Sequence, residues 1–152
     1  MIADLKTIAP DYRTYLLTLP RTAVVAAADR ALTIASEMDT IGAKLQARIT
    51  AAQNAGANVS SAQSAYADYQ AKVADAKVQA QAALDLVLNL QPDQGNATVR
   101  ASNTAALKSA RTKLQAATAD LKAARKDMQA ITQVVKGKGV NAAASTTVST
   151  NS

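Results

Sequence analysis

The chain has 152 residues, a net charge of +6, and no Cys, His, Trp or Phe. Its length is that of a single domain. Without Cys and His there is no zinc site of the usual kind, no thiol nucleophile, no Ser-His-Asp triad and no imidazole that could carry protons near neutral pH. No nucleophile–base pair or metal-ligand set can be written from the remaining residues. The sequence therefore predicts a protein that is not an enzyme and binds no cofactor.

Alanine supplies 37 of the residues, which is typical of a helical protein with a thin core. Residues 1–20 are set apart because Pro10 and Pro20 enclose a short apolar stretch. That stretch is either a short helix or an extended arm, and Pro20 is expected to end it in both cases. This N-terminal arm either docks a partner or folds over the end of the protein. The candidate docking residues are Tyr12, Tyr15, Leu16 and Leu19.

A first long helix is predicted over about residues 22–54. Apolar residues recur on it at intervals of three and four, which is the pattern of a coiled-coil seam. The predicted seam is Val24, Ala27, Ala31, Ile34, Met38, Ile41, Leu45, Ile49 and Ala52. The step from Leu45 to Ile49 breaks the alternation, so we expect a locally relaxed supercoil there. Gly56 is expected to end the helix.

A second helix is predicted over about residues 61–90, with Ser60 or Ser61 as its N-cap. Its seam is Ala62, Tyr66, Tyr69, Val73, Ala76, Ala80, Ala83, Val87 and Leu90. Tyr66 and Tyr69 are interpreted as core residues. The region around Leu84–Leu90 is apolar nearly all round, so we expect this end to be the best buried and the most sensitive to Leu-to-Ala changes. Asp93 is interpreted as a turn residue before the next helix.

A third helix is predicted over about residues 96–136. Its seam is Leu107, Ala110, Leu114, Ala117, Leu121, Ala124, Met128, Ile131 and Val135. Gly137 and Gly139 are expected to end the helix. Residues 138–152 are almost entirely small or polar and are expected to form a disordered Ser/Thr/Asn-rich tail.

Three helices joined by two short loops run up, down and up. The predicted fold is therefore all-α: an elongated, coiled-coil-like antiparallel three-helix bundle over residues 21–137, with alanine-rich seams. The alternative is a hairpin of the second and third helices, with the first helix packing on another chain. No stretch approaches the roughly 18 apolar residues that a membrane-spanning helix needs.

Charge is distributed unevenly along the chain. Residues 100–138 hold nine basic and two acidic residues, a net +7, while the rest of the chain sums to −1. This basic stretch either attracts an anionic polymer or forms a solvated helix face that pairs with acids of the other helices. The candidate polyanion contacts are Lys108, Arg111, Lys113, Lys122, Arg125 and Lys126.

Four segments (11–20, 26–30, 44–49 and 84–92) resemble an uncharacterised family of alanine-rich, helical bacterial proteins. Such proteins often follow a signal peptide or a membrane segment. The resemblance implies a position in the cell envelope or outside the cell, although a cytoplasmic position stays open. It implies no activity and no site residue.

The leading functional hypothesis is a non-enzymatic structural or interaction module of the bacterial envelope that contacts a protein partner or a second copy of itself. One alternative is binding of nucleic acid or a cell-wall polyanion through the third helix, which would weaken steeply with salt. A second alternative is a holdase-like chaperone, which requires exposed apolar grooves. A small-molecule substrate is not expected.

Overall fold

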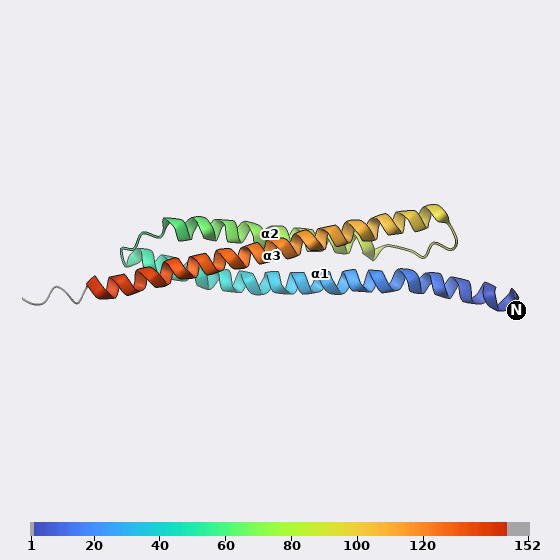
Figure 1. Cartoon of the computed structure of the whole chain (residues 1–152), viewed down its shortest axis with the longest axis horizontal. Coiled ribbons are helices and arrows are strands. Elements are labelled where there is room, and N and C mark those ends of the chain that lie inside the picture. Colours follow the sequence, from blue (N-terminus) through green and yellow to red (C-terminus); the bar gives the residue numbers. More distant parts are fainter. Residues whose placement is uncertain (1, 146–152) are drawn as a thin grey trace, which may run out of the picture. The chain divides into compact units, whose positions relative to one another are not determined.

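In a computed structural model, the described part of the protein comprises the backbone of residues 2–145, with side chains at residues 8–9 and 11–136. It forms three helices: α1 (Ile2–Asn54), α2 (Ser60–Leu88) and α3 (Ala97–Ser145) (Figure 1). No strand occurs in these residues. The all-α class and the antiparallel packing of three helices are confirmed.

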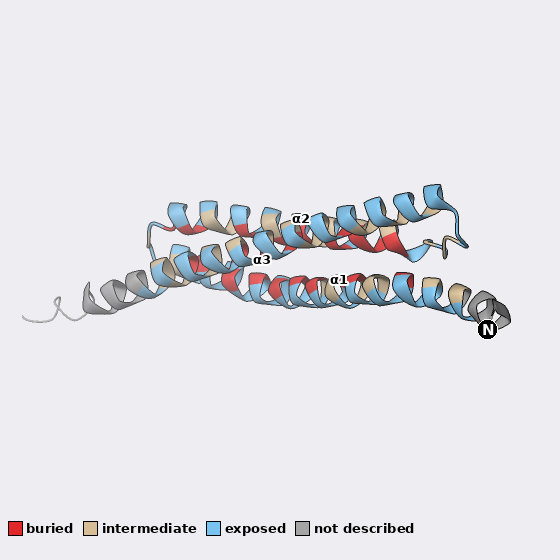
Figure 2. Ribbon diagram, turned by 45° about the vertical axis from the view of Figure 1, so that its right-hand side comes forward, coloured by how far each residue is buried: buried red, intermediate tan, exposed pale blue. Residues whose placement is uncertain are grey.

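The chain divides into two compact units. The first combines residues 1–33 with residues 76–118, and the second combines residues 34–75 with residues 119–152. Each unit contains a segment of all three helices, with the α2 segment antiparallel to the other two. Within each unit, buried residues lie on the sides where helices face one another (Figure 2).

The core of the first unit forms around two residues of α2. Ala83 and Val87 pack with Val24 of α1 and Ala110 of α3, and all four are buried. Alanine allows the helix axes to approach closely, at the lower end of the usual 8–10 Å range. Larger, half-buried side chains surround this centre: Val25, Leu86, Leu90, Leu107 and Leu114.

Helix α1 runs without a break through both of its prolines, so the expected arm is helical and continuous with the rest of α1. A proline inside a helix removes a backbone hydrogen bond and costs about 3 kcal/mol. Contacts on both sides of Pro20 offset this cost. Leu17 is buried, and the guanidinium of Arg21 donates hydrogen bonds to the carbonyls of Leu88 (2.5 Å) and Leu90 (3.4 Å). The expected helix end at Pro20 is wrong, because these contacts outweigh the local preference of proline.

The core of the second unit contains the largest buried side chain of the described residues, that of Tyr69 on α2. Its ring stacks on that of Tyr66, with centroids 6.1 Å apart, and its hydroxyl donates a hydrogen bond to the carbonyl of Met38 on α1. Burial, with a smaller effect of Asp39, raises the pKa of Tyr69 to about 12. The prediction that both tyrosines are core residues is confirmed, since Tyr66 is half-buried and Tyr69 is buried.

Helix α1 faces the core in a different phase from the one predicted. Ile34 and Ile41 are 39% and 37% exposed, whereas Ala35 and Gly42, one residue further on, are buried. The buried and half-buried positions include an unbroken 4-3 alternation: Leu17, Arg21, Val24, Ala28, Ala31, Ala35, Met38, Gly42, Leu45, Ile49 and Ala52. The expected break at Leu45 is therefore absent. Gly42 leaves room for the ring of Tyr69, because a Cβ at this position would lie 3.1 Å from the Cε1 atom of Tyr69.

The seams of α2 and α3 agree with the prediction, since every predicted position is buried or half-buried. The apolar end of α2 agrees only in part. Leu84 is buried, Leu86 is half-buried, and Leu88 is exposed. A helix that is apolar all round still turns one side to solvent when only two other helices cover it.

The structure shows the caps at two of the expected helix boundaries, the end of α1 and the start of α2. Gly56 ends α1 with a φ of 79°, and its N–H donates to the carbonyl of Gln53 while that of Ala57 donates to Ala52, the pattern of a Schellman cap. At the start of α2 the side chain of Asn58, rather than Ser60 or Ser61, accepts the capping hydrogen bond from the Ser60 N–H.

At the other end of the chain, α3 continues through Gly137 and Gly139 to Ser145, so the expected end at Gly137 is not observed. The remainder of the expected tail, residues 146–152, lies outside the described residues.

Candidate functional site

The four candidate docking residues lie together on α1, on the side turned away from the core. Buried Leu17 marks the core-facing side of this part of the helix. At about 100° per residue, the exposed apolar residues are centred on the opposite side. This outward strip consists of Ile8 (60% exposed), Tyr12 (60%), Tyr15 (57%), Leu16 (52%) and Leu19 (52%).

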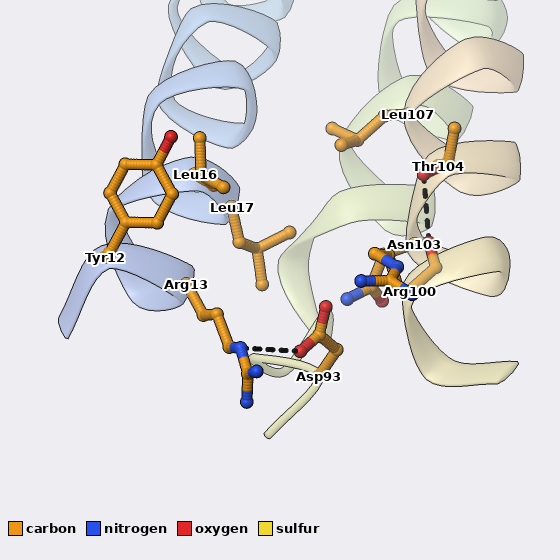
Figure 3. A pocket seen from close by; sticks show the side chains of 9 residues that line it. All are labelled: Tyr12, Arg13, Leu16, Leu17, Asp93, Arg100, Asn103, Thr104 and Leu107. Atoms are coloured by element: carbon orange, nitrogen blue, oxygen red, sulfur yellow. Dashed lines mark hydrogen bonds and ion pairs between the residues drawn. The ribbon is translucent and has the colours of Figure 1, made fainter. Parts of the chain in front are cut away.

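A pocket of about 370 Å³ adjoins the outward strip in the first unit (Figure 3). Tyr12 and Leu16 of the strip form its edge on α1, and Leu17 and Leu107 supply apolar side chains between α1 and α3. The polar lining residues are Arg13, Asp93, Arg100, Asn103 and Thr104.

The loop between α2 and α3 fixes one end of this pocket. Asp93 accepts a hydrogen bond from the Gly95 N–H (2.8 Å), which confirms its role in a turn, and it also pairs with Arg13 of α1 at 3.9 Å. Gly95 has a φ of 90°, a backbone conformation that favours glycine, and a Cβ there would also lie 2.7 Å from the guanidinium of Arg13, which would have to shift. Asn103 donates to the carbonyl of Gln91 at 2.8 Å and ties α3 to the same loop.

The chemistry of the pocket is that of a contact site. Its groups are apolar side chains, amide and hydroxyl groups, and two guanidinium groups, of which Arg13 already faces a carboxylate. Arg100 is exposed and has no ion pair with a residue whose side chain is described. The combination suits an apolar group that carries a negative charge beside it.

The six candidate polyanion contacts divide between the two units. In the first unit Lys108 and Arg111 are exposed one helical turn apart, and half-buried Lys113 donates a hydrogen bond to Gln79 of α2 at 3.3 Å. In the second unit Lys122, Arg125 and Lys126 are all exposed. None of the six forms an ion pair with a side chain in the described part of the chain. The expected pairing with acids of the other helices is therefore not observed for these residues.

One ion pair of the second unit does connect two helices. The ammonium of Lys72 on α2 lies 2.6 Å from a carboxylate oxygen of Asp127 on α3. The hydrogen bond to Asp127 raises the pKa of Lys72, and the more distant charge of Asp68 adds a smaller effect in the same direction. Lys72 thus pairs across the bundle rather than with Asp68 along its own helix.

Sequence reasoning missed two residues of this region. Ile8 lies four residues before Tyr12, so the spacing of 8, 12, 15 and 19 repeats the 4-3 pattern of the seams and could have identified it. Arg100 was counted only as part of the basic stretch. Its place in the lining of the same pocket as Leu16 depends on how α3 packs against α1, which no local pattern gives.

Comparison of the chain with known protein families, curated proteins and solved structures finds no match. The resemblance to alanine-rich envelope proteins therefore stays an expectation. No helix in the described residues has the length and apolarity to cross a membrane. Those residues also hold no group of three or more acidic side chains that could bind a metal ion.

Proposed function

We propose that the protein is a non-enzymatic helical bundle that acts by binding another protein surface through the outward strip of α1. The observation that carries this proposal is that five large apolar side chains, each more than half exposed, lie on one side of one helix. Soluble proteins rarely expose such a patch unless something covers it. The two tyrosines of the strip, Tyr12 and Tyr15, also support binding to a protein, because tyrosine is enriched at protein–protein interfaces.

The rest of the molecule fits a supporting role. The core is built from thin, alanine-rich seams, and α1 holds its place through packing and through Arg21, while its opposite side stays open. We propose the bacterial cell envelope or surface as the place of action, on the ground of the resemblance and the abundance of Ser, Thr and Asn at the C-terminal end.

The test replaces Tyr15 with a photoreactive amino acid in the cells that make the protein. Val78, on α2 in the same unit, is 63% exposed and belongs to no strip, so it is the matched control position. The proposal predicts a cross-linked product at position 15 and none at position 78. No product at either position, or equal products at both, would contradict docking through the strip.

A second candidate function is binding of an anionic polymer through the basic residues of α3. It is favoured by one observation: five of the six candidates are exposed and carry no partner charge among the described side chains. No aromatic side chain lies among them, so stacking on single-stranded bases is not expected. Binding of the chain to heparin or duplex DNA that falls by a factor of 10 or more between 50 and 200 mM salt would support this function, and binding that is absent at 50 mM would exclude it.

A further inference from the structure

We propose that the partner of the outward strip is a second copy of this chain, with the two α1 helices packed in parallel about a two-fold axis. This inference rests on the proposed function, because it names the occupant of the same surface. Its first support is spacing. Ile8, Tyr12, Tyr15 and Leu19 follow each other at 4, 3 and 4 residues, the interval at which two helices interlock their side chains.

The size of the strip fits a weak dimer. Side chains of this size that are more than half exposed each offer roughly 100–150 Å², so five of them offer roughly 600 Å² per chain. Two copies would bury about 1,200 Å², the lower end of the range for specific protein interfaces. A dimer with a Kd in the micromolar range is therefore expected.

The charges beside the strip select the parallel orientation. At about 100° per residue, exposed Asp11 lies on the edge of the strip opposite Leu16. Leu16 borders a pocket whose charged lining residues are Arg13, Asp93 and Arg100. Since Arg13 pairs with Asp93, Arg100 gives this side a net positive charge, opposite to that of Asp11. A two-fold axis along α1 places each edge against the opposite edge of the other copy, so that Asp11 meets the partner's Arg100 twice. An axis across α1 would place each edge against the same edge of the other copy, so Asp11 would not meet the partner's Arg100.

The first experiment measures the mass of the whole chain by sedimentation equilibrium from about 1 to 500 µM. The proposal predicts a mass that rises from 15.7 kDa toward twice that value. Leu19→Lys is expected to weaken the dimer at least 10-fold, whereas Val78→Lys, the matched change of an exposed apolar residue, leaves it unchanged. A monomer at every concentration, or equal effects of the two variants, would overturn the proposal.

The second experiment tests the orientation and uses the fact that the chain has no cysteine. Thr22 is exposed and continues the spacing of the strip, three residues after Leu19. In the parallel dimer the two copies of Thr22→Cys face each other and form a disulfide under mild oxidation. In an antiparallel dimer they lie far apart, because residue 22 then faces the start of the other helix. Thr112→Cys, exposed on α3, is the control and is expected to remain a thiol.

A third comparison tests the charges themselves. Asp11→Arg or Arg100→Asp alone is expected to weaken the dimer several-fold, and the double exchange is expected to restore it. Failure of the double exchange to restore dimerisation would contradict the pairing of Asp11 with the partner's Arg100.

Cross-linking at position 15 distinguishes docking through the outward strip from self-association of the chain. A cross-linked product at position 15 with a mass other than twice that of the chain would support docking and overturn self-association. The absence of any product would overturn both.

Discussion

The Nη2 atom of Arg21 on α1 lies 2.5 Å from the carbonyl oxygen of Leu88, the last residue of α2. The last turn of α2 contains no basic residue of its own. A cation near the end of a helix stabilises the carbonyls that have no partner within the helix. Arg21 therefore completes α2 from a neighbouring helix and, at the same time, holds α1 in place just after Pro20.

Replacing Arg21 with methionine should lower the free energy of unfolding by about 1–3 kcal/mol, because charge-assisted hydrogen bonds of a half-buried group are lost. Urea denaturation followed by circular dichroism measures the change. Arg30→Met, at an exposed position of the same helix, serves as the control and is expected to change the stability by less than about 0.5 kcal/mol. Equal losses in the two variants would show that Arg21 does not cap α2.

Gly42 is expected to tolerate no β-branched side chain. Valine at this position places its Cβ 3.1 Å from the ring of Tyr69, which is buried and held by its hydrogen bond to Met38. We expect Gly42→Val to destabilise the protein by about 1–3 kcal/mol more than Ala43→Val, which puts the same side chain on the adjacent exposed position. Thermal unfolding of both variants provides the comparison, and equal melting temperatures would contradict the close packing at Gly42.

Alkaline pH should weaken the fold through Tyr69. Its pKa is raised from 10.0 to about 12 in the folded state, so the folded protein holds the phenolic proton more tightly than the unfolded chain does. Its contribution to stability is complete below pH 10 and is lost as the pH rises from about 10 to 12. Tyr69→Phe should be less stable at pH 7, because it lacks the hydroxyl hydrogen bond, but should lose less stability than wild type between pH 9.5 and 11.5. Parallel losses in the two proteins would show that Tyr69 is not the responsible group.

The phase of α1 gives a further prediction. Ile34→Ala should cost less than about 1 kcal/mol because Ile34 is partly exposed, whereas Ile49→Ala should cost about 2–5 kcal/mol because Ile49 is fully buried. Denaturant unfolding of both variants tests this difference. If Ile34→Ala lowered the free energy of unfolding more than Ile49→Ala does, Ile34 would belong to the core-facing seam, as the sequence predicts.

On two of the three helices, the periodicity of the apolar residues is enough to predict which positions are buried. On α2 and α3 a single set of positions combines the large and small apolar residues, so the seams could be read directly. On α1 two sets compete, since Ile34 and Ile41 are more apolar than Ala35 and Gly42. Which set faces the core depends on the space that Tyr69 of α2 occupies beside Gly42. This packing between helices cannot be read from the sequence of α1 alone.

The expected helix end at Pro20 rested on the local preference of proline alone. Pro20 is a valid helix breaker in isolation, but Arg21 and Leu17 make contacts on either side of it that the sequence does not reveal. The docking residues could be proposed from sequence because they are large, apolar and close together. Their position opposite the core required the observation that α1 continues through Pro20.

The central claim is that the first part of α1 is a packed helix with a buried side and an open apolar side. Amide hydrogen exchange by NMR along residues 11–49 tests it most directly. The account predicts that the amides of Leu17, Arg21 and Val24 are protected to a degree comparable with those of Met38 and Leu45, because all belong to one packed helix. Rapid exchange up to residue 20, with protection only beyond it, would show a separate arm and contradict the account.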